Sequence, residues 1–169
     1  LFRSGSGALI SMRDRIKRVT GTGMVFDPNP LASSGDFTLV DNGDATNAAL
    51  DAARYSVPLP NLDGSGFTRG LWVDARTKNA NGRVQSPTNT FNFNRSQSGF
   101  EQANVYYHLD RTQTRIQALG ILTANARQQE VLVDGQQVDN SYYDPQKLLI
   151  NCGKGGVDDA EDADVVVHE

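Results

Sequence analysis

Short apolar stretches alternate with clusters of turn-forming residues through the first part of the chain. Residues 24–26 (Met-Val-Phe) precede the turn cluster 27–30 (Asp-Pro-Asn-Pro), and residues 37–40 precede the cluster 41–44 (Asp-Asn-Gly-Asp). Because Pro, Gly, Asn and Asp favour turns, apolar runs between them indicate short strands. The chain from residue 21 to residue 73 is therefore predicted to be β-structure.

A glycine-rich turn and a polar segment follow. Residues 57–60 and 67–73 flank the turn 61–66, an arrangement typical of a hairpin. Residues 74–99 are rich in Asn, Ser, Thr and Gly and hold a brief aromatic alternation beginning at Phe91. They are predicted to form a long surface loop with one short strand.

The helical period is clearest over residues 99–119. Phe100, Ala103 and Tyr107 share one face at this spacing. Gly120 follows as a stop, because glycine readily adopts the left-handed conformation that ends a helix. We predict one long helix here.

Strand character returns after this helix. Residues 130–133, 136–143 and 147–151 have the apolar and β-branched content of strands, and the Asp-Gly pair at 134–135 is typical of a hairpin turn. These segments predict a small antiparallel sheet.

The last segment predicts a second helix over residues 158–169. Asp158 stands at the N-cap position with Glu161 three residues later, which is the spacing of a capping box. The acidic run 158–164 suits the positive end of a helix dipole, and calcium binding is the alternative role of these carboxylates. The last turn is expected to fray, because its carbonyls lack partners.

Composition narrows the classes of function. The 169 residues fit one domain, and a formal net charge of −4 with a pI of about 5.1 argues against a nucleic-acid partner, which needs a basic surface. No apolar run approaches the roughly 18 residues of a membrane span, so no membrane partner is expected. The single cysteine, Cys152, excludes an internal disulfide and leaves the compartment open.

The candidate catalytic residues are His168 and Glu169. In zinc peptidases with the H-E-x-x-H motif, two histidines four residues apart share a helix face and bind zinc, and the glutamate after the first polarises the attacking water. A His-Glu pair alone carries little weight, because such pairs occur by chance. The segments around it decide the interpretation.

Those segments resemble the thermolysin-like and fungalysin-like zinc metallopeptidases in order and spacing. The resemblance covers residues 99–169 well and residues 20–98 only loosely. It is carried by these stretches: 106–111 (Tyr-Tyr-His-Leu-Asp-Arg), 116–120 (Ile-Gln-Ala-Leu-Gly), 140–143 (Asn-Ser-Tyr-Tyr), the strand 147–151, the glycine-rich link 153–156, and 164–169 (Asp-Val-Val-Val-His-Glu).

The resemblance implies a role for each matching residue. His168 matches the first zinc ligand, Glu169 the general base, and Asp164 a position that binds structural calcium. The edge strand that holds the peptide substrate through backbone hydrogen bonds is matched by Asn140, Ser141 and Tyr143. The resemblance also implies zinc as the cofactor, calcium as a second candidate ion, a peptide or protein substrate, the enzyme's own propeptide as a further candidate partner, and secretion to the extracellular space.

The expected fold class is α+β, with a twisted antiparallel sheet, one long helix and a truncated active-site helix, as in the N-terminal lobe of those peptidases. Residues 1–20 are expected to be a leader or the end of an upstream element, and residues 21–169 the lobe. The family's remaining zinc ligands follow Glu169, so we expect a fragment that is inactive by itself. The alternative is a non-catalytic extracellular β-rich binding module whose His-Glu ending is coincidental.

Two further side chains of reactive type, His108 and Cys152, are expected to have structural and not catalytic roles. His108 lies beside aromatic residues on the predicted long helix and is expected to have a packing or surface role. Cys152 ends a predicted strand and is expected to be a partly buried thiol.

Overall fold

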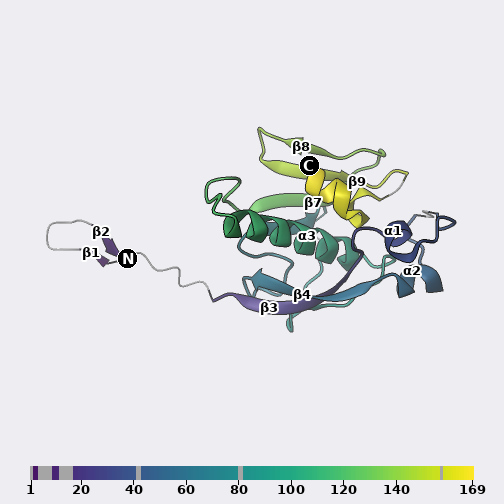
Figure 1. Ribbon diagram of the computed structural model, residues 1–169, viewed down its shortest axis with the longest axis horizontal. Helices are drawn as coiled ribbons and strands as arrows, with labels where there is room; N and C mark the ends of the chain where they lie inside the picture. The colour runs from purple at the N-terminus through teal and green to yellow at the C-terminus, as the bar shows by residue number, and fades with distance from the viewer. Residues whose placement is uncertain (1, 4–8, 12–16, 41–42, 80–81, 157) are drawn as a thin grey trace.

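The computed structural model describes residues 2–3, 9–11, 17–40, 43–79, 82–156 and 158–169. Near the N-terminus, β1 (Phe2–Arg3) pairs antiparallel with β2 (Leu9–Ser11). The remaining elements form two sheets with a long helix between them (Figure 1). The α+β class is therefore confirmed.

The first sheet has three strands in the order β4-β3-β6. The strands are β3 (Val19–Val25), β4 (Tyr55–Leu62) and β6 (Thr90–Phe91). β3 pairs antiparallel with β4 and parallel with β6. Two short helices, α1 (Pro30–Ser34) and α2 (Ala48–Ala52), lie in the connection from β3 to β4.

The second sheet has four strands in the order β5-β7-β9-β8. The strands are β5 (Val73–Thr77), β7 (Gln129–Gln136), β8 (Tyr142–Asp144) and β9 (Leu149–Gly153). β5 and β7 are parallel, β7 and β9 are parallel, and β8 is antiparallel to β9. β8 forms one edge of this sheet.

The predicted long helix is present as α3 (Gly99–Ala118), one residue shorter than expected. Gly120 adopts the left-handed conformation at φ 83°, as a helix stop requires. α3 contacts strands of both sheets, and its first half is buried on all sides (Figure 1). The expected one-sided burial is therefore wrong for the first half of the helix, and in the second half Thr114 and Ala118, which the helical spacing places on the face of Phe100, are exposed.

The all-antiparallel sheet was a wrong prediction. Parallel strands need a long crossover, and α3 lies within the connection from β5 to β7. The hairpin predicted at residues 134–135 is also wrong, because the Asp-Gly pair lies inside β7. Asp134 has φ 53°, and the register with β9 shifts between Leu132 and Gln136, so the pair makes a bulge instead of a turn.

The core lies between the two sheets and around α3. Its largest members come from both sheets and the helix: Leu59, Leu62, Val73, Phe91, Tyr106, Val131 and Ile150. Gly23 lets α3 approach β3, because a Cβ there would lie 2.9 Å from the Leu59 side chain and 3.4 Å from Ala103. Within the described ranges, none of the helices combines the length and apolar character needed to cross a membrane.

The C-terminal segment forms two short helical pieces where one helix was predicted. A 3₁₀ turn, η2 (Asp159–Glu161), is followed by α4 (Ala163–His168). Asp162 interrupts them with an extended backbone, and its side chain caps α4 by accepting from the Asp164 N–H at 2.8 Å. Asp158 caps η2 as expected, and Glu161 pairs with Arg95.

Candidate functional site

The start of α4 is fixed to the loop after β3. The Ala163 N–H donates to the Pro28 carbonyl at 2.9 Å, and the Asn29 side chain donates to Asp162 Oδ2 at 2.9 Å. These bonds satisfy groups at a helix N-terminus that have no partner within the helix. They fix the direction in which α4 carries His168.

Asn104 of α3 connects this helix with the end of β3 and with η2, the turn that precedes α4. This fully buried α3 side chain accepts from the Phe26 N–H at 3.0 Å and donates to the Ala160 carbonyl at 2.9 Å. One side chain thereby satisfies buried backbone groups at the end of β3 and in η2. The position of α4 relative to α3 depends on it.

The C-terminal end of α4 opens on a cleft of about 310 Å³. Its walls come from α3, the second sheet and the end of α4, and it is lined by Trp72, Leu109, Thr112, Gln113, Ile116, Asn125, Arg127, Gln129, Tyr143, Ile150, Val167, His168 and Glu169. His168 is exposed, and Glu169 is partly buried. The cleft thus brings the predicted zinc ligand and general base beside Tyr143 of the edge strand.

Arg127 is a cleft residue that the sequence did not single out. Its Nη2 donates to the Tyr143 hydroxyl at 3.0 Å and to Gln129 Oε1 at 2.7 Å. These two bonds hold a guanidinium in the same cleft as the Glu169 carboxylate. An arginine can bind a carbonyl or carboxylate group of a ligand in such a setting. No sequence motif marks it, because it lies in an irregular segment.

The other two predicted substrate-binding residues lie outside the cleft lining. Asn140 is exposed, and its carbonyl accepts from the Gln136 side chain. Ser141 is buried, where its hydroxyl donates to Asp159 Oδ2 at 2.6 Å and accepts from the Gly153 N–H at 3.1 Å. The Ser141 side chain is thus used to connect β9 with η2.

The metal-ligand residues predicted on α4 are not grouped with others. Asp164 is exposed in the first turn of α4. In the described parts of the chain, neither His168 nor Asp164 belongs to a cluster of three potential ligands. A tight zinc site has three or four protein ligands, so these residues alone do not make one.

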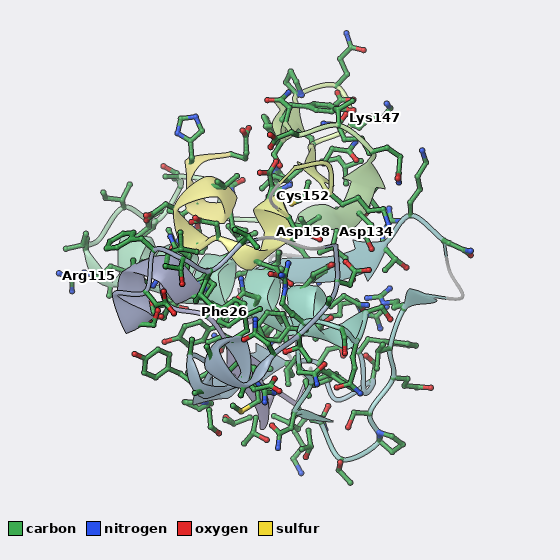
Figure 2. All side chains as sticks on the ribbon, turned by 90° about the vertical axis from the view of Figure 1, so that its right-hand side faces the viewer. Phe26, Arg115, Asp134, Lys147, Cys152 and Asp158 are labelled. Carbon is green, nitrogen blue, oxygen red and sulfur yellow. The ribbon has the colours of Figure 1, made fainter. Side chains whose placement is uncertain are left out.

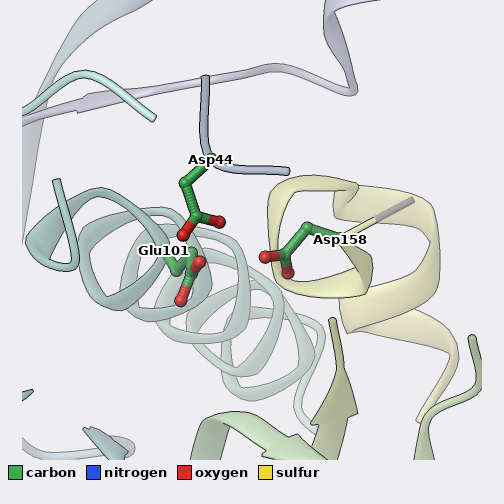
Figure 3. A group of neighbouring side chains, drawn as sticks. All are labelled: Asp44, Glu101 and Asp158. Atoms are coloured by element: carbon green, nitrogen blue, oxygen red, sulfur yellow. The ribbon is translucent and has the colours of Figure 1, made fainter. Parts of the chain in front are cut away.

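Three carboxylates converge elsewhere. Asp44, Glu101 and Asp158 each place a ligand oxygen within 4.8 Å of the others (Figure 3). Burial, with a further effect of Asp158, raises the pKa of Glu101 to about 11. Burial likewise raises the pKa of Asp158 to about 6. Of the three, only Asp158 was considered from the sequence, because the other two lie far from it along the chain.

His108 has the packing role expected of it, and Cys152 is fully buried where a partly buried thiol was expected. His108 is 4% exposed, and its Nε2 donates to the Phe26 carbonyl at 2.7 Å; burial lowers its pKa. Cys152 belongs to the hydrophobic core. In Figure 2 it lies inside the molecule, and Lys147 of the β8–β9 connection marks the periphery for comparison. Burial raises the pKa of the Cys152 thiol, which keeps it protonated and unreactive.

Comparison with protein-family models, with curated proteins and with solved structures finds no match. A proposal about the function of this chain therefore depends on its own residues and geometry.

Proposed function

We propose that this chain is part of the catalytic domain of a secreted zinc-dependent endopeptidase, to which it contributes His168 and Glu169. One observation carries the proposal: the cleft at the end of α4 is lined by both residues and by Tyr143 of the edge strand. A peptidase needs its water-activating groups beside a surface that holds an extended peptide. The lining of this cleft supports such an arrangement.

The edge strand supplies the substrate part of the proposal. β8 has β9 on one side and forms the edge of the sheet on the other. An edge strand offers unpaired backbone groups, and an extended peptide binds by adding itself as a further strand. Such binding uses backbone hydrogen bonds, so the internal contacts of the Ser141 side chain are compatible with it.

The zinc ligands are incomplete within the 169 residues. The chain has two histidines, and His108 is buried against the Phe26 carbonyl, which leaves His168 as the available imidazole. When held by a full ligand set, zinc lowers the pKa of a bound water to about 7. Glu169 is assigned the task of accepting a proton from the attacking water. The proposal therefore includes that residues 1–169 alone do not hydrolyse peptides.

The test compares residues 1–169 with a longer polypeptide from the same gene. The proposal requires a histidine at the third position after Glu169, followed by a further carboxylate ligand. The short chain should bind zinc weakly and leave casein intact, and the longer polypeptide should gain both zinc binding and hydrolysis. Micromolar zinc binding by the short chain, or a different residue at the third position, would contradict the proposal.

Glu169→Gln separates metal binding from catalysis in the longer polypeptide. The amide keeps the shape of the side chain and removes the base, so zinc content should be unchanged while kcat falls by about 10²-fold or more. Exposed Glu130 offers a matched control, since Glu130→Gln removes the same charge from β7, outside the cleft lining. Equal turnover by Glu169→Gln and Glu130→Gln would refute the assigned role.

Calcium binding at Asp164 is a separate part of the proposal. Asp164 is exposed at the start of α4, one turn before His168, where a cation would strengthen the helix that carries the active site. A smaller calcium-dependent rise in melting temperature for Asp164→Asn than for the wild type would support this, and an equal rise would contradict it.

A further inference from the structure

Three carboxylates from distant parts of the chain meet beside the first turn of α3. Asp44 lies in the segment before α2, Glu101 in α3, and Asp158 at the cap of η2. One oxygen from each lies within 4.8 Å of the others, and Figure 3 shows the three side chains pointing toward one another. Like charges at this distance repel strongly unless a proton or a cation lies between them.

Glu101 provides a second and independent observation. The residue is 3% exposed, and its Oε2 is buried without a hydrogen-bond partner. A buried carboxylate oxygen normally has a partner, because its desolvation is costly otherwise. In Figure 3 the side chains of Asp44 and Asp158 both point toward the Glu101 side chain.

Two cations near the cluster form ion pairs with other carboxylates. Arg95 pairs with Glu161, with Nε to Oε2 at 2.8 Å. Lys154 faces Asp134, a fourth carboxylate beside Glu101, with Nζ to Oδ1 at 3.9 Å. The strongest electrostatic effects on Glu101 come from Asp158 and Asp134 and have the same sign as its own charge. Asp134 thus adds a fourth carboxyl group beside the three.

We propose that Asp44, Glu101 and Asp158 bind a divalent cation, and that the cation is Ca²⁺. The donor atoms are all carboxylate oxygens, which hard cations prefer and which are a poor match for zinc. Oxygens on opposite sides of Ca²⁺ are on the order of 5 Å apart, twice a Ca–O distance of about 2.4 Å. The smaller Mg²⁺ brings such oxygens to about 4.2 Å and demands a stricter octahedral geometry. The three ligand oxygens lie within 4.8 Å of one another, a limit that both ions meet, so the choice of calcium rests on its less strict coordination geometry.

The site would connect three segments that the sequence separates widely. Asp44 belongs to the β3–β4 connection, whereas Asp158 begins the η2–α4 segment that leads to His168. A cation bound by both, and by Glu101 of α3, would hold this segment against the body of the fold. The site shares no residue with the His168–Glu169 pair or with Asp164, so it does not depend on the proposed peptidase function.

The experiment measures Ca²⁺ binding to the 169-residue chain by isothermal titration calorimetry and by the shift of the melting temperature. The wild-type chain, freed of metal with a chelator, should bind Ca²⁺ and melt several degrees higher in its presence. Asp44→Asn should weaken binding at least about tenfold, because it removes one of three charged ligands. Asp44 is exposed, so this variant should fold like the wild type.

Two further variants make the test specific. Glu101→Gln should also lose Ca²⁺ binding, while its melting temperature without metal should rise or stay the same, because the amide places no charge at this buried position. Asp164→Asn is the matched control on α4 and should bind Ca²⁺ at this site as the wild type does. Absence of binding by the wild type up to about 10 mM Ca²⁺, or an Asp44→Asn affinity within about twofold of wild type, would overturn the proposal.

Discussion

Arg95 and Glu161 form a buried ion pair, with Nε to Oε2 at 2.8 Å and side-chain exposures of 4% and 7%. The pair joins the segment before α3 to η2, two parts of the chain separated by 66 positions. Removal of one partner takes a compensating charge away from the other, which stays buried, and this is far more costly than the net contribution of the pair.

We expect Glu161→Gln to lower the free energy of unfolding by about 3 kcal/mol, as measured by urea denaturation. Glu130→Gln is the control, because the Arg76–Glu130 pair is exposed at 35% and 51% and such pairs contribute less than about 1 kcal/mol. Similar losses in the two variants would show that burial of the Arg95–Glu161 pair has no special cost.

Asn104 connects the end of β3 with η2 through the two hydrogen bonds of its side chain. Asn104→Ala leaves the Phe26 N–H and the Ala160 carbonyl without these partners in a buried region, at a cost of about 2–5 kcal/mol in total. Amide exchange should also become faster in α4, whose start depends on η2. The exposed Asn92 offers a control, and Asn92→Ala should change neither quantity. Unchanged exchange in α4 for Asn104→Ala would contradict the connecting role.

The sequence predicted the elements better than their arrangement. The helix at 99–118 has a clear apolar period and a glycine stop, so its bounds were predicted within one residue. The parallel pairs β3–β6, β5–β7 and β7–β9 were not predicted, because local patterns do not distinguish parallel from antiparallel neighbours. The pair Asp134-Gly135 favours a turn in isolation, but the pairing of β7 with β5 and β9 incorporates it as a bulge.

In the site, too, residues adjacent in sequence were easier to predict than contacts between residues far apart in the chain. His168 and Glu169 were found because they are adjacent in a motif. Arg127 was missed because its relation to Tyr143 exists only after the second sheet forms. The convergence of Asp44 with Glu101 depends likewise on how the β3–β4 connection packs on α3. Such contacts between distant residues are set by topology, which the local pattern does not encode.

Asp110 should make stability fall as the pH rises through the acidic range. Burial raises its pKa to about 6 from an ordinary 3.8, against an opposing hydrogen bond from Asn61. Between these two values the unfolded chain releases the proton while the folded chain keeps it, so the folded state loses stability as pH increases. Asp110→Asn keeps a side-chain acceptor for Asn61 and removes the ionisation.

The stability of Asp110→Asn relative to wild type should therefore rise between pH 4 and pH 7, by up to about 3 kcal/mol. The other titratable groups are present in both proteins, so the difference between the two denaturation series isolates Asp110. A difference that stays constant with pH would contradict the raised pKa.

Substitution of His168 tests whether this residue serves zinc binding or the stability of the fold. Its side chain is exposed at the end of α4, and exposed substitutions change stability by less than about 0.5 kcal/mol. His168→Ala should therefore leave the melting temperature of the 169-residue chain unchanged. In a longer polypeptide that binds zinc, the same substitution should remove a ligand and reduce zinc affinity at least about tenfold, with loss of the zinc-dependent rise in melting temperature.

His108→Ala is the contrasting variant, because it removes the buried partner of the Phe26 carbonyl and should destabilise both polypeptides whether or not zinc is present. Retention of full zinc affinity by His168→Ala would remove His168 from the ligand set and leave the His-Glu pair without a catalytic assignment.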